Sequence, residues 1–216
     1  MFSPIVHPPE FVRHIFKKYT WKLLPEAGSE NVLYITIDDG PIPEMTPGTL
    51  DLLKRYNAKA TFFCVGENVK KYPDLFDRIV FEGHSIGNHT YNHLNGLKTR
   101  TEEYVENVIK ADSLINSNLF RPPHGRMKPS QTKILSKNRK IILWDILSKD
   151  YDKRVSKERC FMNVSDYVSD GSVVVFHDNV KAQENQRYAL EKTLEKYSLG
   201  GFEFKGIPYK PLNAVC

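Results

Sequence analysis

Short apolar runs rich in β-forming residues alternate with amphipathic stretches from residue 32 onward. This alternation is typical of a mainly parallel α/β domain. It predicts about seven strands, over residues 32–37, 60–65, 85–88, 119–121, 140–146, 172–177 and 202–204. It predicts helices over residues 46–56, from about 73 onward, and over 99–116, 129–138, 156–168 and 183–197. We find no internal repeat or long linker, and therefore expect residues 32–216 to form one domain.

Sequence signals also mark where two of these helices begin. Thr46 is followed by Pro47, which is typical of a helix cap with proline at the first helical position. Thr99 and Glu102 stand at the spacing of a capping box, just before an apolar stripe. We therefore expect a helix to start at each of these two threonines.

Residues 1–31 precede the first predicted strand and carry a pattern of their own. Within residues 11–24 the apolar side chains gather on one face of a helix, and the basic side chains lie mostly elsewhere. These apolar residues are Phe11, Val12, Ile15, Phe16, Tyr19 and Leu23. We expect an amphipathic helical segment packed on the rest of the protein, and contact with a membrane surface is the alternative.

Length and composition exclude several classes of protein. The chain has 216 residues, of which 40% are hydrophobic and 26% charged, so it can bury a core and is neither disordered nor a coiled coil. No apolar run approaches the roughly 20 residues of a membrane-spanning helix. The start of the chain lacks a secretory signal pattern, and the scattered Cys64, Cys160 and Cys216 are expected to be free thiols. These features predict a cytoplasmic location.

The net charge of +5 is distributed unevenly along the chain. Residues 121–160 contain twelve Lys and Arg against four Asp and Glu, a net charge of +8, which leaves −3 on the remainder. Most such clusters are solvated helix faces, so we favour that interpretation over an anion-binding surface.

Polar side chains follow nearly every predicted strand at its carboxyl end. In a parallel sheet or barrel these ends emerge on one face, where binding sites are built. The clusters are Asp38-Asp39-Gly40-Pro41, Asn88-His89-Thr90, Arg121-Pro122-Pro123, residues 145–150, and His177-Asp178. We therefore expect them to converge on a single pocket.

Two of these clusters contain the residue types of a metal site. His89 and His93 are four residues apart, which places two imidazoles on one face of a helical turn. Asp38 and Asp39 add adjacent carboxylates, although an Asp-Gly pair is also typical of a tight turn. Two imidazoles and one carboxylate leave a divalent ion an open position for water, which fits hydrolysis of an amide or ester. Zinc is the first choice, and cobalt, nickel, iron or manganese would accept the same donors.

Five segments stand out by their order and spacing. They are TIDDGP at 36–41, GHSIGNHTYNH at 83–93, FRPPHG at 120–125, ILWDILSKD at 142–150 and VVFHD at 174–178. Together they resemble the five motifs of the polysaccharide deacetylases, carbohydrate esterase family 4. The resemblance covers residues 32 to about 205 and implies a distorted (β/α) barrel with fewer than eight strands. A full barrel takes roughly 250 residues, so the chain length agrees with a shortened barrel that is open along one side.

The resemblance implies a role for individual residues. The reaction that it implies is removal of N-acetyl groups by attack of a metal-bound water. In that reaction Asp38 would be the general base and His177 the general acid. Arg121 would orient Asp38, and Asp150 would orient and charge His177. These surroundings push the pKa values of base and acid apart, as the reaction requires. The implied metal ligands are Asp39, His89 and His93.

The walls of the substrate pocket follow from the same resemblance. They are Pro123, His124, Gly125, Trp144, Tyr151 and Val175. The chain departs from the family pattern where His124 replaces Tyr, Leu147 replaces Asp, Tyr151 replaces Trp and Val175 replaces Leu, and these changes affect substrate fit more than the reaction. We expect His124 to form pocket wall, with approach to the metal or to a substrate phosphate as alternatives. A backbone N–H within 121–125 would receive the oxyanion.

Three functions are compatible with the sequence. The favoured one is deacetylation of a chito-oligosaccharide or a peptidoglycan-like carbohydrate, and the second is hydrolysis of a non-sugar amide or imide on the same scaffold. The third is a non-catalytic protein that binds an anionic polymer through its basic segment, and the complete set of catalytic residue types argues against it. No nucleic-acid-binding motif is recognisable. The predicted partner is an N-acetylated glycan or oligosaccharide.

Overall fold

The computed structural model describes residues 6–24 and 30–212 of the chain. Its strands are β1 (Tyr19–Thr20), β2 (Val32–Asp38), β3 (Ala60–Cys64), β4 (Ser85–Asn88), β5 (Leu119–Phe120), β6 (Lys140–Ile142), β7 (Ile146–Leu147), β8 (Ser172–His177) and β9 (Glu203–Phe204). Its helices are α1 (Glu10–Ile15), α2 (Thr46–Arg55), α3 (Gly66–Lys71), α4 (Pro73–Phe81), α5 (Thr101–Ile115), α6 (Pro129–Leu135), α7 (Lys157–Ser165) and α8 (Gln183–Leu199). A 3-10 turn, η1 (Pro123–Gly125), follows β5.

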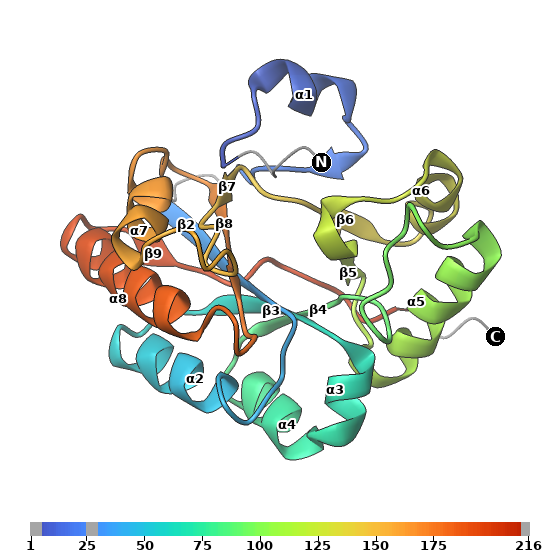
Figure 1. The fold of residues 1–216 in the computed structure, drawn as a ribbon, viewed down its shortest axis with the longest axis horizontal. Coiled ribbons are helices and arrows are strands. Elements are labelled where there is room, and N and C mark those ends of the chain that lie inside the picture. The colour runs from blue at the N-terminus through green and yellow to red at the C-terminus, as the bar shows by residue number, and fades with distance from the viewer. Residues whose placement is uncertain (1–5, 25–29, 213–216) are drawn as a thin grey trace.

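The strands form one curled parallel sheet. Within the described residues, its nine strands follow the order β1-β6-β5-β4-β3-β2-β8-β7, and β9 pairs with β2. Every pairing is parallel. Figure 1 shows α2 to α8 arranged around the outside of this sheet. The expected distorted, shortened (β/α) barrel is confirmed, with nine strands where about seven were predicted.

The central strands are apolar along their whole length because both of their faces are covered. All seven residues of β2 and all five of β3 are buried. On β2, Ile35 belongs to a core cluster that includes helix residues such as Leu50 and Leu190. Tyr34, on the opposite face of the strand, packs with Phe63 in a second cluster that lies inside the barrel. The alternation along β2 thus separates an outer core from an inner one.

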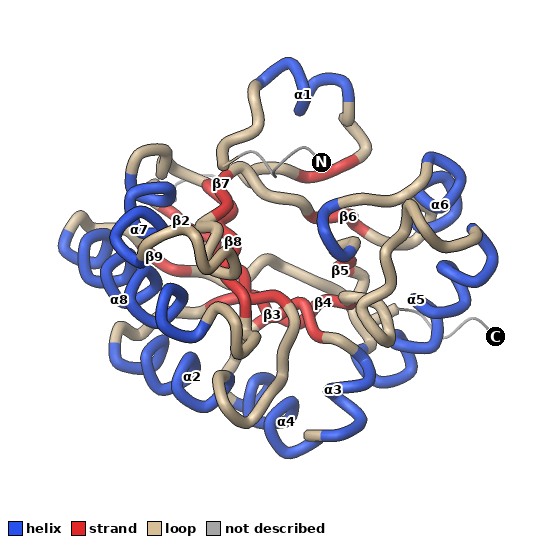
Figure 2. Tube along the Cα trace, viewed as in Figure 1, coloured by secondary structure: helices blue, strands red, loops and turns tan. Residues whose placement is uncertain are grey.

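Strand register brings the polar residues at the strand ends together, and Figure 2 shows the strands concerned, β2, β4, β5 and β8, in red. Asp38, at the end of β2, is paired with His177 at the end of β8. Asn88, at the end of β4, is paired with Phe120, the residue before Arg121. Because these strands are parallel, their carboxyl ends and the loops that follow lie at one end of the barrel.

The helix predicted over residues 11–24 is wrong in its extent. Helix α1 has six residues and buries none of its side chains. Phe11 is 66% exposed and Ile15 is 69% exposed, so the helical part of this apolar face does not pack on the barrel, whereas Tyr19 and Leu23 do pack against its core clusters. The chain then continues as β1, which runs parallel to β6.

Backbone hydrogen bonding explains this difference. Strand β7 is one edge of the sheet path, and β6 would be the other edge without β1, so the backbone groups of both strands need partners. The N–H of Leu147, on β7, donates to the carbonyl of Val6, and the N–H of Leu143 donates to the carbonyl of Thr20. The N-terminal segment therefore bridges the open side of the barrel, at the top of Figure 1.

No helix within the described ranges is long and apolar enough to cross a membrane.

Two further differences from the prediction have a cause that the hydrogen bonding shows. The strand predicted over 140–146 is two strands, because β6 pairs with β5 and β1 whereas β7 pairs with β8. Helix α5 begins at Thr101, and the hydroxyl of Thr99 donates to a backbone carbonyl upstream rather than capping the helix. The cysteines Cys64 and Cys160 are free and buried, and Cys216 lies outside the described residues.

Candidate active site

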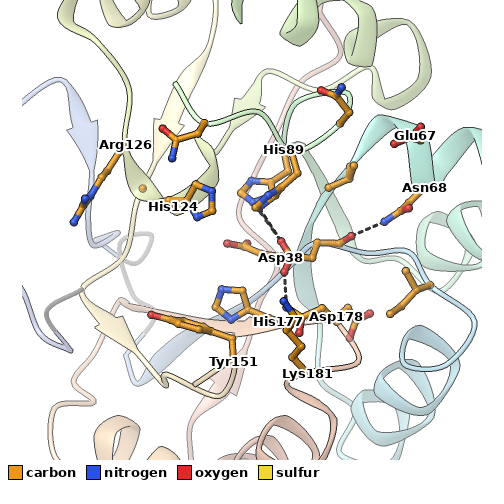
Figure 3. A pocket seen from close by; sticks show the side chains of 18 of the residues that line it. Asp38, Glu67, Asn68, His89, His124, Arg126, Tyr151, His177, Asp178 and Lys181 are labelled. Atoms are coloured by element: carbon orange, nitrogen blue, oxygen red, sulfur yellow. Dashed lines mark hydrogen bonds and ion pairs between the residues drawn. The ribbon is translucent and has the colours of Figure 1, made fainter. Parts of the chain in front are cut away.

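A groove of about 1170 Å³ opens at the end of the barrel where the strands finish (Figure 3). It is lined by residues that follow β2, β4, β7 and β8 and by the loop that contains η1. The predicted site residues that line it are Asp38, Asp39, His89, His93, His124, Gly125, Trp144, Tyr151 and His177. Arg121 and Asp150 are fully buried behind this wall, where each binds a groove residue.

Asp38 is held by a buried arginine. Nη1 of Arg121 donates to Oδ1 of Asp38 at 2.7 Å and to Oγ1 of Thr36 at 2.7 Å. The guanidinium also donates to two backbone carbonyls, of Ile142 and Leu143. Burial lowers the pKa of Arg121, the neighbouring Asp38 carboxylate raises it, and the guanidinium stays charged. A desolvated, charge-assisted contact of this kind fixes Asp38 in one orientation.

Asp39, His89 and His93 bring three donor atoms together, all within 4.8 Å of one another. Oδ1 of Asp39 lies 3.6 Å from Nε2 of His89 and 3.2 Å from Nε2 of His93. This oxygen is buried and has no hydrogen-bond donor. Nδ1 of His89 lies 2.8 Å from the carbonyl oxygen of Arg121, so it donates there and leaves Nε2 with a lone pair. Such a donor set fits a divalent ion.

The protonation of this cluster suits a metal site. Burial lowers the pKa of His89 to about 4, so the imidazole is neutral. Burial alone would raise the pKa of Asp39, but close contacts with His93, His177 and His89 hold it well below its ordinary value. A neutral imidazole beside an ionised carboxylate is the form in which these residues bind metals.

The local structure of the histidine pair differs from the prediction. The segment after β4 is a loop rather than a helical turn, and Thr90 and His93 have φ values of 65° and 58°. The two imidazoles nevertheless lie 5.1 Å apart, centre to centre. The backbone turns that bring them together therefore replace the helical face that the four-residue spacing suggested.

His177 and Asp150 form the second charged pair. Nδ1 of His177 donates to Oδ1 of Asp150 at 2.7 Å, and the backbone N–H of His177 donates to Oδ2 at 2.8 Å. Burial lowers the pKa of His177, but the charge and hydrogen bond of Asp150 outweigh it and raise the pKa to about 9. The ring of Tyr151 packs against the imidazole edge at 4.8 Å. His177 is therefore a cation at neutral pH, with Nε2 free to donate a proton.

Two of the residues that were predicted to line the substrate pocket do not line the groove. Pro123 is buried in η1, and Val175 is fully buried in β8, so neither lines the groove. Val175 lies two residues before His177 and therefore faces the same way, but one pleat deeper. Its neighbour Leu147, on β7, lines the groove instead.

His124 stands at the wall, as expected. It has a φ of 60° and is exposed on the groove side of the η1 loop. Its ring packs edge-on against His93 at 4.9 Å. Burial against the protein, then the nearby His93, lower its pKa. It is not among the three residues whose donor atoms cluster.

Two side chains to which the motifs assigned no role, Asp178 and Asn179, support the turn after β2. Asp178 is fully buried, and its carboxylate accepts hydrogen bonds from the hydroxyls of Thr46 and Thr49, each at 2.8 Å. Burial raises the pKa of Asp178 to about 7. Its backbone N–H donates to the carbonyl of Asp38. Asn179, the next residue, donates to Asp39. Both residues continue the His177 cluster, and that adjacency is the sequence signal that could have found them.

Gly125 is required by the packing of Trp144. Its φ is +65°, and a Cβ there would lie 2.4 Å from Cη2 of Trp144. We expect Gly125→Ala to lower the free energy of unfolding by about 1–3 kcal/mol, through backbone strain and overpacking. Urea unfolding monitored by tryptophan fluorescence measures the effect. Gly48→Ala is the control, because a Cβ at that site in α2 meets nothing within 4 Å and should not destabilise the protein. Equal stability of the Gly125 variant and wild type would contradict the expectation.

The fold and the site together define a class of protein. It is a parallel (β/α) barrel whose strand ends hold an Asp-His-His donor cluster beside an Asp–Arg pair and an Asp–His pair. Residues 26–139 match the family model described as polysaccharide deacetylase. The chain belongs to the polysaccharide deacetylase family, carbohydrate esterase family 4.

Several relatives show how close this similarity is. The chain is 37% identical over 182 residues to a peptidoglycan-N-acetylglucosamine deacetylase of Bacillus cereus, covering 81% of this chain and 66% of that protein. It is 30% identical to a chitooligosaccharide deacetylase of Azorhizobium caulinodans, covering 85% of this chain and 94% of the relative. The crystal structure of the Bc1960 peptidoglycan N-acetylglucosamine deacetylase, in complex with 4-naphthalen-1-yl-N-oxidanyl-benzamide, matches with a TM-score of 0.82 and 32% identity over 96% of each chain.

Proposed function

We propose that the protein is a metal-dependent hydrolase that removes N-acetyl groups from an N-acetylated carbohydrate. The observation that carries this proposal is the convergence of an oriented carboxylate, Asp38, and a cationic imidazole, His177, on the same groove as the Asp39 donor cluster. A carboxylate that takes a proton and a cationic imidazole that gives one are what amide hydrolysis needs. The names of the relatives support the same reaction.

The donor cluster fits one divalent ion, for which we propose zinc. Asp39, His89 and His93 would hold it, and when bound it supplies Lewis acidity that polarises a carbonyl and acidifies water. The same nitrogen and oxygen donors also accept cobalt, nickel, iron or manganese.

The two charged pairs divide the proton transfers between them. Arg121 binds Oδ1 of Asp38, so Oδ2 is left to take a proton from the attacking water. The oxygen of that water bonds to the acetyl carbon as the carbon–nitrogen bond breaks. Asp150 holds Nδ1 of His177, so Nε2 gives its proton to the leaving amine. The products are acetate and a free amino sugar, with Asp150 and Arg121 acting through the groups they orient.

We propose a peptidoglycan-like glycan as the substrate, in preference to a neutral chito-oligosaccharide. Lys98, Arg126 and Lys181 are exposed where they line the groove. Among the described lining residues, Glu67 is the one exposed acid. A cationic rim attracts anionic substrates, and peptidoglycan carries carboxylates that chito-oligosaccharides lack. The peptidoglycan relatives support the same choice.

Acetate release from both glycans tests the proposal. We expect the zinc-loaded protein to release acetate, with a higher kcat/KM on peptidoglycan fragments at low ionic strength. The double variant Lys98→Gln/Lys181→Gln should lower kcat/KM about tenfold on the anionic glycan and little on the neutral one. Lys133→Gln, an exposed lysine of α6 away from the groove, is the matched control.

The outcomes separate the possible functions. Equal kcat/KM on both glycans, insensitive to salt, would contradict the anionic substrate and leave the deacetylase intact. Turnover of small non-sugar amides without acetate from either glycan would support an amide or imide hydrolase on the same barrel. Salt-sensitive binding of a polyanion without any hydrolysis would support a non-catalytic protein.

A further inference from the structure

We infer that Asn179 is a positioning residue that fixes which oxygen of Asp39 faces His89 and His93. The inference rests on the proposed function, because its consequence is tighter metal binding by that cluster. Asn179 comes two residues after His177, in the loop between β8 and α8. It lines the groove beside the donor cluster.

The two oxygens of Asp39 have different surroundings. Oδ2 accepts a hydrogen bond from Nδ2 of Asn179 at 2.6 Å. Oδ1 is buried without a hydrogen-bond donor and faces the Nε2 atoms of His89 and His93. A carboxylate with one oxygen bound and the other unsatisfied is oriented before a ligand arrives, so less conformational freedom is lost on binding.

The amide of Asn179 is itself fixed from both sides. Its Oδ1 accepts a hydrogen bond from the backbone N–H of Ala182 at 3.1 Å. A backbone N–H can only donate and an ionised carboxylate can only accept, so Nδ2 must face Asp39 and Oδ1 must face Ala182. The loop thus presents an N–H group, and not an oxygen, to the carboxylate.

Asp39 also needs support because of its backbone. Its φ of 78° lies in the left-handed region, which is strained for a residue other than glycine. Nδ2 of Asn68 donates to its backbone carbonyl at 2.8 Å. Two side-chain amides therefore hold one residue, Asn68 through the backbone and Asn179 through the carboxylate. Of these two amides, Asn179 is the one that contacts the carboxylate and so bears on the direction of the metal-facing oxygen.

Substitution of Asn179 by Asp separates this role from a purely structural one. The variant keeps an oxygen that can accept from Ala182, so the loop retains its hydrogen bond. It replaces the donor that faces Asp39 with a second carboxylate oxygen. Two carboxylate oxygens repel each other at that distance, so the Asp39 carboxylate should turn away from this position. Asn179→Ala removes both hydrogen bonds without adding charge.

Zinc affinity, measured without substrate by competition with a chromophoric chelator, is the test. We expect Asn179→Asp to bind Zn²⁺ about 10–100-fold more weakly than wild type, and Asn179→Ala to be weakened less. The absorption spectrum of bound Co²⁺ should change in the same variants. Gln183→Ala, at the exposed start of α8, should bind both ions as wild type does. Thermal unfolding in a chelator should show that the Asp variant is folded at the temperature of the binding assay.

Two results would overturn the inference. One is a Zn²⁺ affinity of Asn179→Asp equal to or higher than that of wild type. The other is a loss in Asn179→Ala that Asn179→Asp restores, because the contact with Ala182 would then explain it. A wild-type protein that binds neither Zn²⁺ nor Co²⁺ would contradict the proposed metal site itself, and the inference would fall with it.

Discussion

Asp38→Asn should lower kcat for acetate release about 10²–10⁴-fold, the usual contribution of a positioned general base. Asn has the shape of Asp and can still accept the hydrogen bond of Arg121, but it cannot take a proton from water. Zinc affinity should change little, because Asp38 is not one of the three clustered donors. Steady-state kinetics on an N-acetylated glycan, with zinc binding measured in parallel, gives both numbers.

The control for this variant is the same chemical change far from the groove. Asp77→Asn, on the exposed side of α4, should leave kcat unchanged. Asp38→Asn also leaves the buried Arg121 without its counter-charge, so we expect lower stability, and thermal unfolding shows whether the variant is folded at the assay temperature. A folded Asp38→Asn protein with near wild-type kcat would remove Asp38 from the mechanism.

Asp150→Asn should move the alkaline limb of the kcat/KM profile to lower pH. Burial lowers the pKa of His177, and Asp150, with smaller contributions from Asp39 and Asp38, raises it to about 9, so loss of the Asp150 charge should lower this pKa. The acid form then disappears at lower pH, and we expect kcat near pH 8 to fall about 10²-fold or more. Asp152→Asn is the control, since this half-buried carboxylate pairs with Arg154 and should leave the profile unchanged.

The free energy of unfolding should also depend on the protonation of His177. The pKa of His177 is raised above its ordinary 6.5, so the pair stabilises the folded state fully below about pH 6.5. That contribution is lost as pH rises through about 9, and Asp150→Asn should abolish this loss. Urea unfolding across this range measures it. A wild-type protein whose stability does not change over this window, or a variant with an unshifted alkaline limb, would show that Asp150 does not charge His177.

The fold was largely predictable because its signals are local and repeated. Apolar strands each followed by a polar cluster indicate parallel strand ends on one face, and the register of Asp38 with His177 bears this out. Strand β1 could not be found, because two residues within an amphipathic stretch look helical until their neighbours on β6 are known. The same holds for 140–146, where pairing partners and not local preference divide the strand.

The site was predictable where a residue type carries its own chemistry. Arg121, Asp150 and the clustered donors stand in motifs, and the structure brings them together. Val175 was predicted to line the pocket, but it is fully buried. A motif gives the order of residues along the chain, and it does not show how far along the strand from the pocket a residue lies. Asn179 was missed because an amide that binds a carboxylate has no spacing rule, and its partner lies 140 positions away in sequence.

The most direct test of the proposed reaction is the stoichiometry of its products. The zinc-loaded wild-type protein is incubated with an N-acetylated glycan, and acetate and the new free amine are quantified together by NMR and mass spectrometry. We expect equal amounts of both products, formed by wild type and not by Asp38→Asn. A folded, zinc-loaded protein that releases no acetate from peptidoglycan fragments or chito-oligosaccharides, or acetate without a matching amine, would contradict the account.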